Sequence, residues 1–552
     1  MGATTKKTRS GIQVMAGLIG MIKPLLPVMA VAILMGCVGN LMATFITVLG
    51  GYALLTSVSL YAGNLKLYMI LIIAFAVLRG ILRYAEQASN HFIAFKLLAQ
   101  IRHKVFAALR RLCPAKLDGS RSGNLISIIT SDIELLEVFY AHTISPIAIA
   151  VITSFFMTIF IGKVHPALGA LACLFYLIVG AVIPVCNGRA GSSLGQEYRK
   201  NFGGLNTTVL DNLYGLDEIL QYQTEEERLS SMRRQNKKLE QTNESLKKKE
   251  NTQRVVTDAV ILFAGVVMAM LATYLWSKGL VPAEQIVVVV IGVMSSFGPT
   301  AALSSLSNNL NQTLASGNRV LDILEEEPIV WDVTGRVECP KEDIACEHVT
   351  FSYPEGENIL SDFNAVFEKN KIHGILGKSG CGKSTLLKLL MRFYETESGT
   401  ISYGKTEISG INTKSLRNGI SYVTQETFLF QDTIENNIKV AKEDATREEV
   451  IAAAKKASIH EFIESLPNGY DTKLSELGTS VSGGEKQRIG IARAFLHDAE
   501  FIFLDEPTSN IDSLNEGMIL RSLEQEKQGK TVLLVSHRRS TMGICDDVTA
   551  MG

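Results

Sequence analysis

The sequence predicts two domains of different class: an all-α domain of six membrane-spanning helices, followed by an α/β domain. Mean hydropathy over the 552 residues is +0.19, high for a water-soluble protein, yet 20% of the residues are charged. Six apolar stretches approach the roughly 20 residues that a helix needs to cross a bilayer. After about Ile329, short apolar strands alternate with helical stretches. We therefore expect a transmembrane domain over residues 1–325 and the α/β domain over residues 330–552.

The balance of charges and the number of cysteines exclude several classes of protein. The chain has 54 Lys and Arg against 55 Asp and Glu, a net charge of -1. This balance argues against a nucleic-acid partner, because neutralising phosphates needs an excess of clustered basic residues. The chain has eight cysteines and no C-x-x-C pair, which is too sparse for a disulfide scaffold. We expect reduced, structural thiols.

The six predicted spans set the topology of the first domain. They lie near residues 25–50, 67–85, 139–162, 166–185, 255–276 and 283–306. Lys and Arg gather in the N-terminus and in the stretches 96–137 and 187–254, so the positive-inside rule places these segments in the cytoplasm. The N-terminus lacks the cleavage site of a signal peptide and is interpreted as a lead-in to a retained helix. The sequence predicts a multi-pass protein of the cytoplasmic membrane, with its N-terminus and α/β domain in the cytoplasm.

The two long cytoplasmic loops are predicted to be helical. Stretches 92–112 and 221–254 keep apolar residues at helical spacing with charges between them, as expected if spanning helices continue into the cytoplasm. The pattern breaks with Pro, Gly and Asn at residues 114–123 and 212–215. Each break is either a turn that carries a short transverse helix or a plain interhelical loop.

Charged residues interrupt the second predicted span. Arg79, Arg83 and Glu86 are spaced i, i+4 and i+7 and share one helix face, and His91 follows just past the apolar run. Charges at membrane depth usually face an internal cavity or each other. Two interpretations stay open: a polar patch that lines a substrate path, or a cluster at the cytoplasmic end of the helix whose side chains extend to the interface.

The α/β domain contains a phosphate-binding loop. In HGILGKSGCGKSTLLKLL the pattern G-x-x-x-x-G-K-S stands between an apolar strand and a helix, the context that this motif requires. Backbone N–H groups and the helix N-terminus hold phosphates there. Lys383 is expected to pair with the β- and γ-phosphates of ATP and Ser384 to bind Mg2+. The expected ATP-binding residues of the loop are Gly377, Lys378, Ser379, Gly380, Cys381, Gly382, Lys383, Ser384 and Thr385.

A second motif, FIFLDEP, delivers two carboxylates at the end of an apolar strand. Asp505 is expected to bind Mg2+, and Glu506 to polarise the water that attacks the γ-phosphate. Adjacent carboxylates can also be plain surface charge. Their position after a buried strand, downstream of a phosphate-binding loop, favours catalysis.

Between these motifs, VSGGEKQR resembles the signature of the ATP-binding cassette (ABC) transporters. In that family the signature contacts the γ-phosphate of ATP bound by the opposite subunit, and the matching residues here are Ser482, Gly483, Gly484 and Glu485. Two departures from the usual pattern are Val481 and Glu485, where the family more often has Leu and Gln. The D-loop also differs, since it is Ser-Asn-Ile-Asp instead of Ser-Ala-Leu-Asp.

The resemblance implies roles for five residues outside these three motifs. Gln425 matches the Q-loop residue that links Mg2+ to the membrane interface, Asp512 matches the D-loop aspartate, and His537 matches the switch histidine. Tyr353 matches the aromatic residue that stacks on adenine. Glu476 matches a loop that touches the coupling helices in exporters. Gln425, Lys383, Glu506 and His537 form the expected catalytic set.

Six spans followed by one C-terminal cassette resemble an exporter-type half-transporter. This resemblance implies a homodimer or heterodimer in the lipid bilayer, with two cassettes closing head to tail around two ATP. ATP binding and hydrolysis would then drive alternating access and export of a small molecule.

Within the exporters, the second span and the loop after it resemble the CydC-like subunit of the cytochrome bd assembly exporters. The shared positions are Arg83-Tyr84, Glu86, His91, Arg102, Leu112-x-Pro114-Ala115 and Ser122-Gly123-Asn124-Leu125. This implies a substrate linked to thiols (cysteine or glutathione) or to haem, although Gln87 stands where that pattern has Arg. Lipid, peptide or drug export stays open, as does a regulatory membrane ATPase without transport.

Overall fold

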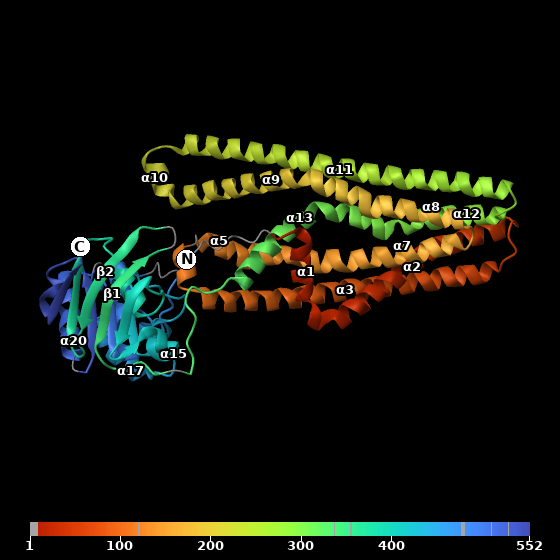
Figure 1. Cartoon of the computed structure of the whole chain (residues 1–552). Helices are drawn as coiled ribbons and strands as arrows, with labels where there is room; N and C mark the ends of the chain where they lie inside the picture. The colour runs from red at the N-terminus through yellow and green to blue at the C-terminus, as the bar shows by residue number, and fades with distance from the viewer. Residues whose placement is uncertain are drawn as a thin grey trace. The chain divides into compact units, whose positions relative to one another are not determined.

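The computed structural model describes residues 9–119, 122–335, 337–353, 356–475, 481–508, 511–527 and 529–551. Contacts divide the chain into two units. The membrane unit consists of Thr5–Arg111 and Ser120–Glu326, and the second unit chiefly of Leu112–Gly119 and Glu327–Gly552. The first is all-α and the second is α/β (Figure 1), so the predicted fold class is confirmed.

The membrane unit is built from long helices joined by short turns. Its α-helices are α1 (Gly11–Gly20), α2 (Leu26–Ser57), α3 (Leu65–Leu112), α5 (Ser122–Ser127), α6 (Ile133–Phe139), α7 (Ser145–Gly162), α8 (Pro166–Leu177), α9 (Ile183–Tyr214), α10 (Leu216–Gln221), α11 (Glu225–Ser277), α12 (Ala283–Ser296) and α13 (Gly298–Glu325). Short π-helical segments at Ile128–Asp132, Tyr140–Ile144 and Ile178–Val182 join α5 to α6, α6 to α7 and α8 to α9.

Six helical segments in the described part of the chain are long and apolar enough to span a membrane. They are Lys23–Ser57, Leu65–Leu112, Leu125–Gly162, Pro166–Cys186, Glu225–Ser277 and Ala283–Leu303. Each overlaps one of the predicted spans, so all six are confirmed. Core side chains such as Ala172, Met268 and Val293 are buried where α7, α8, α11 and α12 pack together.

The long loops are helical, as predicted. Helix α3 continues without interruption to Leu112, and α11 runs from Glu225 into the fifth span beside α9 (Figure 1). Each sequence break contains a short helix, α4 (Ala115–Gly119) and α10. The short-helix interpretation is therefore the correct one, because a Pro or Gly at each break ends one helix and lets another start.

In the second unit, the strands of the described residues form two sheets. The antiparallel sheet has the order β2-β1-β4-β5, and the parallel sheet has the order β6-β7-β8-β3-β9. The strands are β1 (Ile344–Ser352), β2 (Asn358–Phe367), β3 (Ile372–Gly377), β4 (Ser398–Tyr403), β5 (Thr406–Glu407), β6 (Ile420–Val423), β7 (Phe501–Asp505), β8 (Thr531–Ser536) and β9 (Asp547–Met551).

Both faces of the parallel sheet are covered, which is why β7 and β8 are buried along their whole length. One face packs with α14 and the antiparallel sheet, and the other packs with α17, α19 and α20. The helices of this unit are α4, α14 (Lys383–Leu390), α15 (Thr413–Asn418), α16 (Ile434–Lys439), α17 (Arg447–Lys456), α18 (His460–Ser465), α19 (Gly483–His497) and α20 (Ser513–Glu526).

Candidate functional site

Four neighbouring strands of the parallel sheet end at one edge, and the predicted nucleotide residues follow them. Strands β6, β7, β8 and β3 are adjacent and parallel. Gln425 follows β6, Asp505 ends β7, His537 follows β8, and the phosphate-binding loop follows β3. Because the carboxyl ends of parallel strands share an edge, the topology brings these distant segments together.

The phosphate-binding loop has the backbone conformation that its glycines permit. Gly380 has φ +85° and Gly382 has φ +98°, in the left-handed region that side chains disfavour. The Lys383 ammonium donates hydrogen bonds to the carbonyl oxygens of Gly377 (2.9 Å) and Lys378 (2.8 Å). The lysine is therefore buried and held inside the loop, at the N-terminus of α14, where anions bind favourably.

Asp505 combines burial with an unused acceptor. Asp505 is 4% exposed, and its Oδ1 has no hydrogen-bond partner among the described residues. Burial raises the pKa of the Asp505 carboxyl, and a hydrogen bond with Ser384 together with the Lys383 charge acts in the opposite direction. A carboxylate oxygen without a partner beside a hydroxyl fits a hard divalent cation such as Mg2+.

Glu506 is held in a strained conformation by three neighbours. Its φ of 49° is left-handed, unusual for a residue with a side chain. Its N–H donates to the Val535 carbonyl (3.0 Å), and its own carbonyl accepts from Gln487 Nε2 (2.8 Å). The carboxylate Oε1 lies 3.2 Å from Nδ1 of His537. Sequence reasoning missed Gln487, because its burial and its hydrogen bond to Glu506 become visible only in the folded structure.

Tyr353 lies beside the helix of the phosphate-binding loop. It follows β1, and its hydroxyl is 3.2 Å from Thr385 Oγ1. Its ring packs edge-to-face against Phe351 and Tyr394, with centroids 5.1 and 5.2 Å apart. The structure thus brings the predicted adenine-stacking residue and the phosphate loop together.

The signature residues form a separate surface of the second unit. Ser482 caps α19 in a capping box: its N–H donates to Glu485 Oε2 (2.6 Å), and its hydroxyl accepts from the Glu485 N–H (3.4 Å). Glutamine would accept the same bond, so Glu485 in place of Gln preserves this cap. A cavity of about 490 Å³ is lined by Ser482, Gly483, Gly484, Glu485, Arg488, Ile511 and Asp512.

Asp512, the predicted D-loop aspartate, caps α20 within this same surface. It accepts hydrogen bonds from the side chain and N–H of Asn515, and these bonds lower the pKa of its carboxyl. Glu476 and the preceding D-loop residues Ser509 and Asn510 lie outside the described residues.

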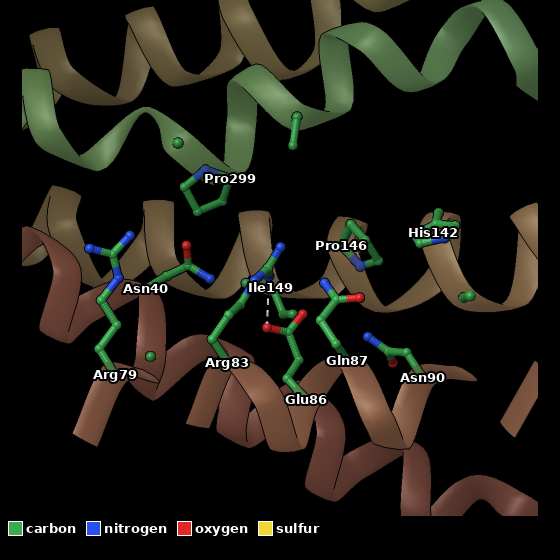
Figure 2. A pocket seen from close by; sticks show the side chains of 14 residues that line it. Asn40, Arg79, Arg83, Glu86, Gln87, Asn90, His142, Pro146, Ile149 and Pro299 are labelled. Carbon is green, nitrogen blue, oxygen red and sulfur yellow. Dashed lines mark hydrogen bonds and ion pairs between the residues drawn. The ribbon is translucent and has the colours of Figure 1, made fainter. Parts of the chain in front are cut away.

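The membrane unit contains a polar cavity of about 470 Å³ (Figure 2). The predicted residues Arg79, Arg83 and Glu86 line it. Sequence reasoning missed most of the rest of the lining, which comes from α2, α3, the segment before α7, α7 and α13: Gly39, Asn40, Gln87, Asn90, Ala141, His142, Pro146, Ile149, Gly298, Pro299 and Ala302. Gln87 and Asn90 continue the i, i+4, i+7 spacing from Arg83, and this was the signal that could have found them.

Charge in the cavity is only partly paired. Arg83 Nη1 lies 2.9 Å from Glu86 Oε2 (dashed line in Figure 2), and Glu86 is 2% exposed because it packs beside Gly36 of α2. His91 is not among the lining residues but contacts one of them. Its ring packs edge-on to His142 with centroids 5.4 Å apart, and its Nδ1 lies 3.4 Å from Glu137.

Comparisons with known proteins agree with this architecture. The family model for the ABC transporter matches residues 360–509, and the model for the ABC transporter transmembrane region matches residues 20–300. A relative from Haemophilus influenzae, named a probable ABC transporter ATP-binding/permease protein, is 47% identical over 543 residues, 98% of each chain. An ATP-dependent lipid A-core flippase from Desulfotalea psychrophila is 31% identical, covering 87% of this chain and 84% of its own.

A solved structure shares the fold. It is that of a bacterial Atm1-family ABC exporter with ATP bound, with a TM-score of 0.83 at 22% identity, covering 96% of this chain and 94% of that chain. The exporter-type architecture is therefore confirmed. The resemblance to the CydC-like subgroup is not confirmed by these similarities.

Proposed function

Because the chain belongs to the ABC transporter family, we propose that it is one half of an exporter dimer in the cytoplasmic membrane, with its N-terminus and cassette in the cytoplasm. ATP hydrolysis coupled to transport follows from family membership. In the proposal, residues 1–325 form the transmembrane domain and residues 330–552 the cassette. The gathering of Lys and Arg in the cytoplasmic loops supports the orientation.

ATP binds between the phosphate-binding loop of one chain and the signature of the second half-transporter. Tyr353 stacks on adenine, the loop N–H groups hold the phosphates, and Lys383 exchanges its two backbone carbonyls for phosphate oxygens. The Ser482 to Glu485 surface serves the ATP of the other chain, because the backbone N–H groups and the dipole at the N-terminus of α19 attract a γ-phosphate.

Ser384, Asp505 and Gln425 are the residues that would hold Mg2+. When bound, this ion neutralises charge on the phosphates. The Asp505 Oδ1 without a described partner and its Ser384 neighbour support the assignment.

Glu506 polarises the attacking water. The water oxygen forms a bond to the γ-phosphorus while the bond to the ADP oxygen breaks, and the water proton moves toward the Glu506 carboxylate. His537 orients Glu506 from 3.2 Å, the observation that carries this proposal. The strained backbone of Glu506, held by hydrogen bonds with Val535 and Gln487, keeps the carboxylate in place from one catalytic cycle to the next.

Two substrate classes are proposed. The resemblance of the second span to CydC-like exporters favours a thiol or haem-linked small molecule. The 31% identical relative, by its name, acts on lipid A core, which favours a lipid. A regulatory ATPase without transport is less supported, since the membrane unit contains a polar cavity.

The decisive experiment is Glu506→Gln. We expect ATP to bind normally while hydrolysis slows by roughly 10²–10⁴-fold, the usual contribution of an acid–base group. The control is Glu500→Gln, just before the same strand, where a Lys341 ion pair is lost and turnover should persist. Normal turnover in Glu506→Gln contradicts the assignment. If purified dimers hydrolyse ATP but move no tested molecule across a vesicle membrane, the regulatory alternative replaces export.

A further inference from the structure

We propose that the cavity of the membrane unit binds an anionic ligand that also carries hydrogen-bond donors, with a carboxylate or phosphate at Arg79 and a hydroxyl or N–H group at Asn90. The shared chemistry is an acidic headgroup, which a water-soluble organic acid or a lipid supplies. The inference rests on the proposed export function, because it names what the exporter takes up.

The first argument is the charge of the cavity. Its lining includes two guanidinium groups and one carboxylate, and Glu86 is already paired with Arg83. Arg79 makes no hydrogen bond or ion pair with any residue that the structure describes. A charge within a membrane span is costly and is retained where it meets a partner. An anion is the partner that Arg79 lacks, whereas a cationic ligand would meet an excess of positive charge.

The second argument is a buried acceptor. Asn90 lines the cavity, is 1% exposed, and its Oδ1 has no hydrogen-bond partner among the described residues. Buried polar atoms are almost always paired, and an unpaired one destabilises the protein. A hydrogen-bond donor on the ligand would pair with the Asn90 Oδ1. The ligand therefore carries a hydroxyl or N–H group in addition to its acid group.

The third argument is size and shape. Asn90 lies eleven positions after Arg79, about 16 Å along a helix that rises about 1.5 Å per residue. The cavity of about 470 Å³ is within the range of small-molecule sites, about 300–1,000 Å³. Figure 2 shows Arg79, Arg83, Gln87 and Asn90 in a row along α3, with Pro299 on the opposite helix. The ligand therefore has polar groups along one side and an apolar side toward α7 and α13.

The test measures ATPase stimulation of the full-length protein in nanodiscs with matched probes. For the soluble source, the pair is glutathione and glutathione diethyl ester, which lacks its two carboxylate charges. For the lipid source, the pair is phosphatidylglycerol and phosphatidylcholine as nanodisc lipid. We expect the anionic member of one pair to reach half-maximal stimulation at a concentration, or for the lipids a mole fraction, at least about tenfold lower than its partner. This value is called the half-stimulating concentration below.

Two variants assign the effect to the cavity. Arg79→Gln is expected to raise the half-stimulating concentration of the preferred anionic probe by about tenfold or more, and to leave that of its partner without net negative charge nearly unchanged. Arg102→Gln is the matched control, because Arg102 is an exposed arginine of the same helix outside the cavity, and it should behave as wild type.

Asn90→Leu separates binding from folding. Removing an unpaired buried acceptor should keep or raise the thermal midpoint while weakening stimulation by the same probe. A lower midpoint with unchanged stimulation would show a purely structural Asn90 and overturn the assignment. The proposal fails if neither anionic probe is preferred, or if Arg79→Gln and Arg102→Gln respond alike. Hydrolysis through Glu506 and transport across a vesicle membrane are measured separately, so the proposed export function can hold even if the cavity shows no preference for an anionic ligand.

Discussion

The nucleotide site and the membrane cavity hold their charged side chains in opposite ways. In the cassette, Lys383 is bonded to two backbone carbonyls, and Glu506 is pinned through both its N–H and its carbonyl. In the cavity, Arg79 and the Oδ1 of Asn90 are without partners among the described residues. One site is built from backbone at strand ends, and the other from side chains projecting from helices.

This difference matches two kinds of ligand: the nucleotide, which is the same across the family, and the transported molecule, which differs between exporters. A nucleotide phosphate is recognised by N–H groups whose direction is set by the backbone, so the loop needs a defined conformation at Gly380 and Gly382. A transported molecule is recognised by side chains, which can be exchanged without refolding a helix. Substitutions in the two regions should therefore affect separate properties.

Of the substitutions that compare the two regions, Lys383→Ala should produce the largest effect. We expect ATP affinity to fall by about a hundredfold or more, because the variant removes a buried charge that pairs with phosphates. Binding of a fluorescent ATP analogue measures this. The control Lys371→Ala removes a half-buried lysine before the same strand, which pairs with the surface residue Glu368, and should bind normally. Unchanged ATP affinity in Lys383→Ala would contradict the claim that the phosphate-binding loop holds ATP through this lysine.

Gly36→Ala should disturb the cavity alone. A Cβ at this position would lie 2.2 Å from Ile149 Cδ1 and 3.1 Å from Glu86 Cδ, so both cavity residues must shift. We expect a loss of stability of roughly 1–3 kcal/mol, as for an overpacked core, with ATP affinity unchanged. Thermal unfolding measures the first and nucleotide binding the second.

Gly50→Ala is the matched control for Gly36→Ala. It places a methyl group on the same helix, where nothing lies within 4 Å, and should be neutral or slightly stabilising. Equal effects of the two substitutions would mean that contact with Ile149 and Glu86 does not matter.

Gln487→Leu should have the smallest effect and tests whether the motifs describe the whole nucleotide site. Losing the hydrogen bond to the Glu506 carbonyl should lower kcat by about tenfold, equivalent to about 1.4 kcal/mol, while the KM for ATP stays constant. A purely structural role would lower the thermal midpoint without this split. Gln525→Leu, on the exposed face of α20, is the control and should leave both constants unchanged.

The confirmed predictions depend on patterns that are local in the chain. The six spans were predictable because the bilayer requires a continuous run of apolar residues. Helices over 92–112 and most of 221–254 followed from spacing within each stretch. The cassette fold followed because strands and helices alternate along a short sequence. The role of each site residue in the cassette stays a prediction.

Gln487 and Asn90 show why other features were not predicted, although the spacing from Arg83 indicates which face of the helix Asn90 occupies. Each is polar and buried, and its contribution depends on which group packs opposite it. In α3 the spacing of Arg79, Arg83 and Glu86 indicated a common face, yet not which helices that face meets. Asn40, His142 and Pro299 reach the same cavity from other segments, and no spacing in the sequence connects them.

By itself, the sequence determined the membrane helices, the α/β cassette and the motifs of its phosphate-binding edge, because hydropathy and backbone conformation are encoded by neighbouring residues. Only the tertiary structure decided that Glu506 lies against His537 and Gln487, and that five segments of the chain line one polar cavity. Packing between distant segments selects which side chains meet, and that selection depends on the shapes of all the surfaces at once.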